Sequence, residues 1–340
     1  MSSSTAPAPV DDETFHVVFP LWAPVGGVIK ILDYLHHTLD AGFSRAVAWG
    51  PPLPGAEAPI RHHAAWVRAH QDPRIEFRLL KDLALPRSPW VLFSEPSQHP
   101  DIEQATPTGS DPRRTIHLVQ NTRHSNPEWH LGFPYLLLHR PITRIHVTHE
   151  VAEAIAPVAN THLPSWTIVE GHGWEYFRAL HDPEREGPLR VGYTTWKSDL
   201  GDRVAAEFVD DDRVAFDALR GPATWADIRD LYHRSDVWLS APGPEEGFYL
   251  PGLEAMAADL VVISALVGGN RAYLEPDGNC LAPPFEDHVA HADAIRSLLT
   301  DPTLSPRLRT AGRATLERHT LEREGREFAA VVAELRDLTK

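Results

Sequence analysis

Residues 236–258 read DVWLSAPGPEEGFYLPGLEAMAA, the stretch that decides the expected fold. The apolar run DVWLS predicts a β-strand, the Pro- and Gly-rich run after it predicts a turn, and the remainder predicts a helix. Glu246 comes just before that helix and Glu254 lies on it, with seven residues between the two. The stretch therefore predicts a strand–turn–helix unit with two carboxylates near the end of a strand.

The start of this helix has the chemistry of an anion site. Gly247, Phe248 and Tyr249, followed by Leu250, bring backbone N–H groups to an end that carries partial positive charge. Such an end suits a phosphate or an anionic leaving group. A carboxylate just before the helix can accept hydrogen bonds from sugar hydroxyls, and one on the helix can reach a ribose.

Outward from this unit, apolar runs alternate with amphipathic stretches, which is typical of parallel sheets covered by helices. The predicted strands are 15–20, 45–49, 75–79, 90–94, 116–119, 142–148, 189–194, 214–217, 236–239 and 260–264. Predicted helices cover 28–41, a segment from 150, and 201–208, 225–233, 252–258 and 288–299, with two more in the last forty residues. This order predicts an α/β protein with two Rossmann-like domains facing a central cleft, where ligands bind beyond the carboxyl ends of strands.

Four segments follow from this pattern. A Pro- and Gly-containing stretch at 157–173 ends the first alternating set, so a boundary is expected there. We expect a disordered polar tail at 1–11, one domain at 12–165 and a second at 166–320. The final segment, 321–340, is expected to be a helix that packs back on the first domain.

Composition excludes several partners. The net charge is -15, and residues 151–340 carry 19 basic and 32 acidic residues against 13 and 15 in residues 1–150, so binding to nucleic acid is not expected. A single cysteine, Cys280, excludes an intrachain disulfide. The chain has no apolar run of transmembrane length, and its first eleven residues lack a signal sequence's apolar segment, so a cytoplasmic protein is expected.

Metal and dinucleotide sites are also disfavoured. Twenty histidines are scattered without H-E-x-x-H or C-x-x-C spacing, and the three aspartates at 210–212 fit a solvated turn better than a metal site. The segment PVGGVIK after the first strand is not G-x-G-x-x-G, and neither a P-loop nor a G-x-S-x-G elbow is present. We therefore expect no metal and no resident cofactor.

The run EGFYLPGLEAMA at 246–257 resembles the signature of family 4 of the retaining GT-B glycosyltransferases, an E-x7-E spacing in an EGFGLPxLEAMA-like run. The resemblance is strong over residues 236–284 and weak over most of the rest. It implies the GT-B fold, with acceptor bound by the first domain and nucleotide-sugar donor by the second. It assigns Glu246 to the transferred sugar and Glu254 to the nucleotide ribose, while Tyr249 replaces the usual glycine.

The resemblance also points to residues outside this run. Segment 24–43 resembles the family's Gly-Gly turn and helix, so Gly26 and Gly27 would let the backbone approach the donor phosphate. In segment 190–203, RVGYTTWKSDLGDR, Tyr193 stands where a diphosphate-binding arginine is expected, Lys197 matches the expected lysine, and Arg203 could substitute.

The loop at 120–130 should contribute a residue that reaches the donor sugar. His124 is the candidate, with His130, Asn121 and Arg123 as alternatives nearby in sequence. Together with Glu246, His124 makes up the expected catalytic pair.

The resemblance implies metal-independent, retaining transfer of a hexose-type sugar, from a UDP-sugar most of all, to the hydroxyl of an unidentified small molecule or glycan. Catalysis would rest on positioning and charge stabilisation, without a side-chain nucleophile. One alternative is a degenerate homologue that binds sugar or nucleotide as a scaffold, which Tyr193 and Tyr249 motivate. Another GT-B enzyme, such as a nucleotide-sugar epimerase, would not be expected to carry the EGF…LEAMA run.

Overall fold

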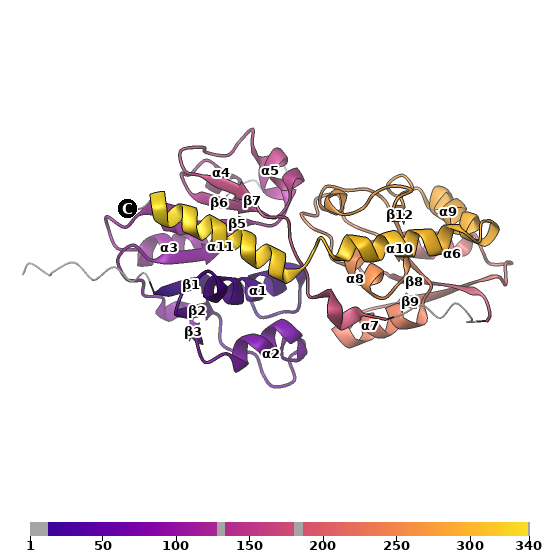
Figure 1. Ribbon diagram of the computed structural model, residues 1–340, viewed down its shortest axis with the longest axis horizontal. Helices are drawn as coiled ribbons and strands as arrows, with labels where there is room; N and C mark the ends of the chain where they lie inside the picture. Colours follow the sequence, from indigo (N-terminus) through magenta and orange to yellow (C-terminus); the bar gives the residue numbers. More distant parts are fainter. Residues whose placement is uncertain (1–12, 128–132, 180–185, 339–340) are drawn as a thin grey trace, which may run out of the picture. The chain divides into compact units, whose positions relative to one another are not determined.

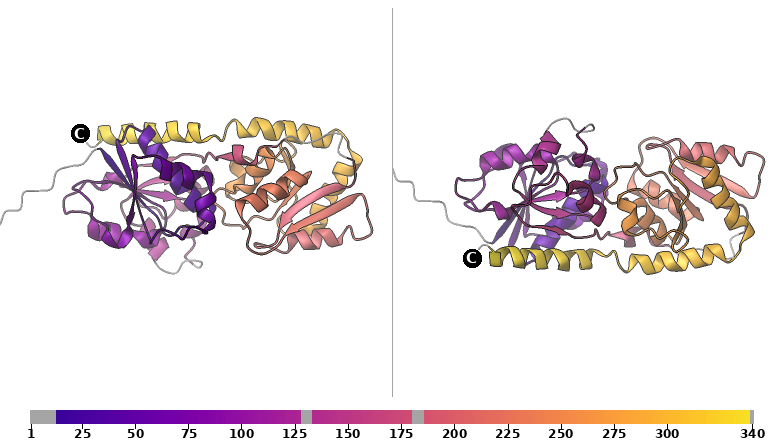
Figure 2. Two further views of the ribbon diagram at one scale, coloured as in Figure 1. Left: turned by 90° about the horizontal axis from the view of Figure 1, so that it is seen from below. Right: turned by 90° about the horizontal axis from the view of Figure 1, so that it is seen from above.

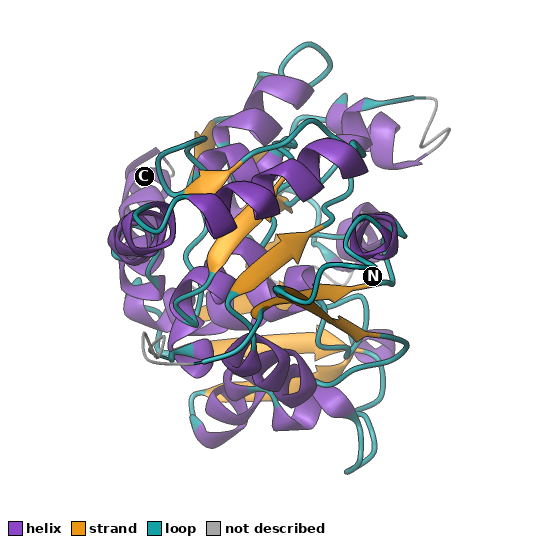
Figure 3. Ribbon diagram, turned by 90° about the vertical axis from the view of Figure 1, so that its right-hand side faces the viewer, coloured by secondary structure: helices purple, strands orange, loops and turns teal. Residues whose placement is uncertain are grey.

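The computed structural model describes residues 13–127, 133–179 and 186–338, and each of its two compact units is a parallel sheet covered by helices (Figure 1). Unit 1 comprises Met1–Val169 and Leu321–Lys340, and unit 2 comprises Glu170–Thr320. The division lies inside the Pro- and Gly-containing stretch 157–173. Figure 3 shows the strands on the inside and the helices on the outside.

Unit 1 contains a seven-stranded parallel sheet in the order β3-β2-β1-β4-β5-β6-β7. Its strands are β1 (Thr14–Val18), β2 (Arg45–Gly50), β3 (Ile75–Leu79), β4 (Trp90–Phe93), β5 (Thr115–Val119), β6 (Thr143–His146) and β7 (Ser165–Thr167). Its α-helices are α1 (Gly26–Asp40), α2 (Ala64–Gln71), α3 (His99–Ala105), α4 (Phe133–Leu138), α5 (His149–Ile155) and α11 (Leu321–Leu338). Short 3-10 turns are η1 (Pro59–His62), η2 (Leu80–Asp82), η3 (Pro96–Gln98), η4 (Pro112–Arg114) and η5 (Thr122–Ser125). Strands β1 and β4, at the centre of this sheet, are buried along their whole length because helices cover both of their faces.

Unit 2 contains a five-stranded parallel sheet in the order β12-β11-β10-β8-β9. The strands are β8 (Leu189–Thr194), β9 (Val214–Leu219), β10 (Val237–Ser240), β11 (Val261–Ser264) and β12 (Cys280–Leu281). The helices are α6 (Leu200–Ala206), α7 (Trp225–Arg234), α8 (Pro251–Ala257), α9 (His288–Thr300) and α10 (Leu304–Leu316), with 3-10 turns η6 (Trp174–Phe177) and η7 (Gly269–Ala272). The chain goes from β8 to β9 on one side and then to β10 on the other, so the strand order reverses between β8 and β10. In such sheets this reversal marks the ligand site.

Helix α11 is held on α1 by charges inside unit 1. Lys30 Nζ lies 2.7 Å from Glu324 Oε2 and 3.5 Å from Asp33, and His37 Nε2 lies 3.2 Å from the same Glu324 oxygen. Burial alone would raise the pKa of the Glu324 carboxyl, but Lys30 and His37 hold it below its ordinary value. Figures 1 and 2 show this C-terminal helix, in yellow, alongside α1 and the rest of unit 1.

An aromatic cluster continues the core from the sheet of unit 1 to α11. The ring of Phe15 on β1 lies 4.9 Å from that of Phe43, 6.2 Å from Trp90 and 6.0 Å from Phe328 on α11. All four rings are buried. Residues 321–338 thus complete the hydrophobic core of unit 1.

Every strand expected from the sequence is present, and the last forty residues form the two expected helices, α10 and α11. Two edge strands were not predicted, β7 and β12, because three and two residues are too few to show an alternating pattern. The tail expected at 1–11 lies outside the described residues.

Candidate functional site

Three of the residues expected to bind donor meet at the reversal point of the unit 2 sheet. Lys197 follows β8 and Glu246 follows β10, and the Lys197 ammonium donates a hydrogen bond to Glu246 Oε1. The same nitrogen lies 4.8 Å from the centre of the Tyr249 ring. The side chain of Lys197 is 41% exposed and that of Glu246 is 24% exposed, so a ligand can reach both.

The loop that carries Glu246 is fixed by the turn after β11. Gly269 N–H donates to the Glu246 carbonyl at 2.8 Å. A Cβ at position 269 would lie 2.1 Å from the carbonyl carbon of Gly247, so only glycine lets the two backbones pack this closely. The Gly-Gly turn at 268–269 therefore packs directly against the loop that carries Glu246.

Tyr249 is held at both its backbone and its ring. The Tyr273 hydroxyl donates to the Tyr249 carbonyl, and a Cβ on Gly252 would lie 2.3 Å from that hydroxyl oxygen, so glycine makes the contact possible. Phe248, Tyr249 and Leu250 are all buried, and burial raises the pKa of the Tyr249 phenol above its ordinary value. The ring is therefore a neutral, fixed surface beneath the Lys197 ammonium.

The expected backbone donors lie in this loop. Among the residues that the structure describes, none accepts a hydrogen bond from the amide groups of Gly247, Phe248 or Tyr249. Helix α8 itself is short, with seven residues and Pro251 at its start. The loop amides, rather than a long helix, are thus the donors that could meet an anion here.

Glu254 lies on α8 inside a buried network. Its Oε2 accepts a 3.0 Å hydrogen bond from the Tyr232 hydroxyl, and its Oε1 lies 3.2 Å from Nε2 of His172. Burial, and then the neighbouring Glu254, raise the pKa of the Tyr232 phenol well above its ordinary value, so the phenol stays a donor. Sequence reasoning missed Tyr232 and His172, because no spacing links them to Glu254.

Tyr193 points into unit 2. Its hydroxyl donates to Asp202 at 2.6 Å, and its ring occupies the space that a Cβ on Gly201 would need, 2.0 Å away. Burial, followed by the Asp202 contact, raises the pKa of Tyr193 to about 12. Arg220, the first residue after β9, binds both oxygens of Asp202 and places one nitrogen 3.5 Å from the Tyr193 hydroxyl. A guanidinium that sequence reasoning overlooked thus lies next to position 193.

Arg203, the suggested substitute, is bound elsewhere. Its Nε donates to Asp199 at 2.9 Å, and its other nitrogens donate to the carboxylate and the carbonyl of Glu286. Ser198, next to Lys197, also donates to Glu286, at 3.0 Å. Arg203 therefore anchors the loop that carries Lys197, and among the described residues its guanidinium contacts neither Lys197 nor Glu246.

The unit 1 candidates lie at the carboxyl ends of β1 and β5. Gly26 and Gly27 open α1, and Gln120 Nε2 donates to the Gly27 carbonyl at 3.0 Å. A Cβ on Gly27 would lie 2.4 Å from Gln120 Oε1, so the glycine accommodates this side chain. His124 is buried in η5, with its ring 6.4 Å from that of His117. His130, one of the alternatives, lies outside the described residues.

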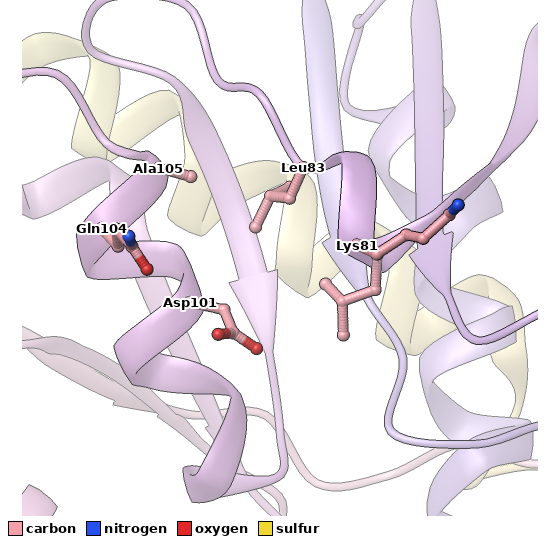
Figure 4. Close-up of a pocket in the computed structure, with 6 residues that line it drawn as sticks. Lys81, Leu83, Asp101, Gln104 and Ala105 are labelled. Carbon is pink, nitrogen blue, oxygen red and sulfur yellow. The ribbon is translucent and has the colours of Figure 1, made fainter.

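A cavity of about 490 Å³ lies elsewhere in unit 1, between η2 and α3 (Figure 4). It is lined by Leu80, Lys81, Leu83, Asp101, Gln104 and Ala105. Figure 4 shows the Lys81 ammonium pointing away from Asp101. None of the expected site residues lines this cavity.

Within residues 13–127, 133–179 and 186–338, no group of three or more His, Cys, Asp or Glu side chains is arranged to hold a metal ion. The same described part of the chain has no helix long and apolar enough to cross a membrane.

The family comparison falls on the segment just described. Residues 220–315 match the family described as "Glycosyl transferases group 1". A stretch of 91 residues is 34% identical to D-inositol 3-phosphate glycosyltransferase of Xylanimonas cellulosilytica, covering 27% of this chain and 22% of that relative. This match therefore spans only about a fifth of the relative's length.

Solved structures resemble the chain over nearly its whole length. Sucrose-phosphate synthase from Thermosynechococcus elongatus has a TM-score of 0.72 at 15% identity, covering 96% of this chain and 100% of that one. Anabaena Alr3699/HepE in complex with UDP and glucose has a TM-score of 0.68 at 14% identity, covering 95% and 100%. At this identity the likeness concerns the fold. The fold is α/β GT-B with two Rossmann-like units, which confirms the expected fold class.

Proposed function

We propose that the chain is a retaining, metal-independent glycosyltransferase of family 4 that transfers a hexose-type sugar from a UDP-sugar to an acceptor hydroxyl. The observation that carries the proposal is the meeting of Lys197, Glu246 and Tyr249 at the sheet's reversal point. The glycosyl transferases group 1 match includes both Glu246 and Glu254. The resemblance to HepE, whose structures contain UDP and UDP-glucose, favours uridine among the nucleotides.

In this proposal the donor lies along the carboxyl edge of the unit 2 sheet. Lys197 and the amides of Gly247, Phe248 and Tyr249 bind the diphosphate, since both are donors that favour a charged acceptor. Glu246 accepts hydrogen bonds from the sugar hydroxyls. Glu254 binds the ribose, because a carboxylate has lone pairs left after it accepts from Tyr232.

The reaction follows from charge and position. The bond between the sugar's anomeric carbon and the diphosphate oxygen breaks, and the leaving charge is stabilised by Lys197 and the loop amides. The acceptor oxygen attacks from the same face, and its proton passes to the departing phosphate oxygen. Unit 1 is proposed to bind the acceptor, with His124 as the candidate contact to the donor sugar and Gly26 and Gly27 as the turn whose backbone can approach the donor phosphate. No side-chain nucleophile is required.

A thermal-shift screen with UDP, GDP, dTDP and ADP tests the donor assignment. A ligand that binds only the native state at about a hundred times its Kd adds roughly 2.7 kcal/mol of stability. We expect UDP to raise the unfolding temperature and the other three to have smaller effects. Stabilisation by GDP, dTDP or ADP instead would show that the donor carries that nucleotide rather than UDP. No shift with any of the four nucleotides would favour the alternative of a degenerate scaffold.

A further inference from the structure

The Lys197 ammonium has two partners of different kinds. It donates to the Glu246 carboxylate, and it lies 4.8 Å above the centre of the Tyr249 ring. The ring belongs to a side chain only 5% exposed, whereas the Lys197 side chain is 41% exposed. One partner is therefore a fixed surface, and the other is a carboxylate that solvent and ligands can reach.

These partners place conflicting demands on the site. Lys197 occupies a lone pair of Glu246 Oε1, and the Gly243 amide lies 3.4 Å from the same oxygen, so release of Lys197 frees that oxygen for a sugar hydroxyl. A diphosphate carries more negative charge than a single carboxylate, so it competes effectively for Lys197. The aromatic ring attracts the ammonium in either case, because its face is negative whatever the other partner is.

We propose that Tyr249 is a positioning residue on which Lys197 exchanges partners. Glu246 holds Lys197 before donor binds, and the donor diphosphate then takes Lys197 and leaves Glu246 to the sugar hydroxyls. Lys197 moves between the two acceptors without leaving the Tyr249 ring. This inference rests on the proposed function, and it makes Glu246 a competitor of the diphosphate as well as a ligand of the sugar.

The exchange explains two departures from the family pattern together. Tyr193 stands where an arginine is implied, and both its hydroxyl and the neighbouring Arg220 are bound to Asp202, so Lys197 bears more of the diphosphate charge. Tyr249 stands where a glycine is implied and supplies a surface that a glycine lacks. The site depends more on Lys197 because position 193 is not an arginine. The Tyr249 ring keeps Lys197 in place.

Isothermal titration of the full-length chain with UDP tests the exchange, with circular dichroism to verify folding of each variant. Glu246→Gln should bind UDP about 3- to 10-fold more tightly than the wild type, although sugar transfer is lost. Tyr249→Leu should bind about 3- to 10-fold more weakly. Tyr249→Phe, which keeps the ring and loses only the hydroxyl, should restore affinity to within about two-fold of the wild type.

A double-mutant cycle separates exchange from simple charge repulsion. In a Lys197→Gln background, Glu246→Gln should no longer tighten UDP binding, because there is no ammonium to release. Equal tightening in both backgrounds would show that the carboxylate merely repels the anion, and unchanged or weaker binding in Glu246→Gln would overturn the exchange outright. If the wild type binds UDP and these variants do not differ from it, only the exchange fails; if the wild type does not bind UDP, the proposed function fails and the exchange with it.

Discussion

The contacts of single residues explain several residue types that the sequence pattern alone does not explain. Gly201 is glycine because the Tyr193 ring fills its side-chain space, and Gly27 is glycine because Gln120 does the same. Tyr232 is a tyrosine rather than a phenylalanine because its hydroxyl is buried against Glu254. In each case the residue type follows from one neighbour in space.

The residues found from the sequence are those within one strand–turn–helix unit. Glu246, Gly247 and Glu254 could be chosen because local spacing places them near one strand end. His172 and Arg220 could not, because they approach Glu254 and Tyr193 only after separate strands and turns have packed. The useful signal for Arg220 was its position immediately after β9, at the same sheet edge as Lys197.

Stability should fall in mildly acid solution because of His146. Burial, and then the nearby Arg144, lower the pKa of His146 from 6.5 to about 4. Since the folded value lies below the unfolded one, the unfolded chain takes up the proton first as pH falls, so stability is present above pH 6.5 and is lost towards pH 4. At pH 5 this residue should cost about 2 kcal/mol relative to pH 7.5, measured by urea unfolding.

His162 provides the comparison for that measurement, because it is an exposed histidine in the same unit. Replacing His146 with Gln should reduce the loss between pH 7.5 and pH 5, whereas His162→Gln should leave it unchanged. An equal loss in both variants would mean that other groups, such as the buried His117, account for the acid sensitivity.

At the scale of elements, periodicity identified segments of ordinary length and failed for short ones. The strands of four to six residues show apolar runs that the sequence reveals, whereas β7 and β12 consist of three and two residues at the sheet edges. Helices α2, α3 and α4, with eight, seven and six residues, were also not predicted, because about two turns show little helical period; α8, with seven residues, was found through the strand and turn before it. Packing, rather than local pattern, determines these elements.

The contact between α1 and α11 should depend strongly on Glu324. Glu324→Ala removes the carboxylate nearest to the buried Lys30 ammonium, so the free energy of unfolding should fall by about 3–5 kcal/mol. Urea unfolding measures this loss. Glu322→Ala, an exposed change on the same helix, should cost little. Similar losses of unfolding free energy in both variants would show that the measurement reports helix propensity rather than the buried charge.

Gly269, the first residue of η7, should be critical for ligand binding. Gly269→Ala places a Cβ 2.1 Å from the Gly247 carbonyl carbon, so the loop that carries Glu246 must move. We expect UDP affinity to fall at least about ten-fold while unit 1 stays folded, because a misplaced loop amide loses its charge-assisted bond. Gly55→Ala, whose Cβ meets nothing within 4 Å, is the matched control and should bind UDP normally. Normal UDP binding by Gly269→Ala would show that this loop is not part of the UDP-binding site.

At the scale of the whole molecule, two units with the same architecture carry different chemistry. Unit 2 brings a lysine, two glutamates and loop amides to one sheet edge, and unit 1 offers histidines and a glycine turn at the corresponding edge of its own sheet. Helix α11 returns to unit 1 after the last residue of unit 2, so the two units are connected twice by the chain. This difference supports the proposal that unit 2 binds the donor and unit 1 binds the acceptor.

The most direct test of the central claim is sugar transfer, measured as UDP released from UDP-glucose with a panel of acceptors, by the wild type, Glu246→Gln and Glu245→Gln. Glu245 is the adjacent carboxylate, so its variant changes the same charge without touching the proposed sugar ligand. We predict that Glu246→Gln lowers kcat at least about a hundred-fold, as expected when a transition-state contact is removed, while Glu245→Gln retains activity. Equal rates in all three proteins would contradict the claim that the Lys197–Glu246–Tyr249 site transfers sugar.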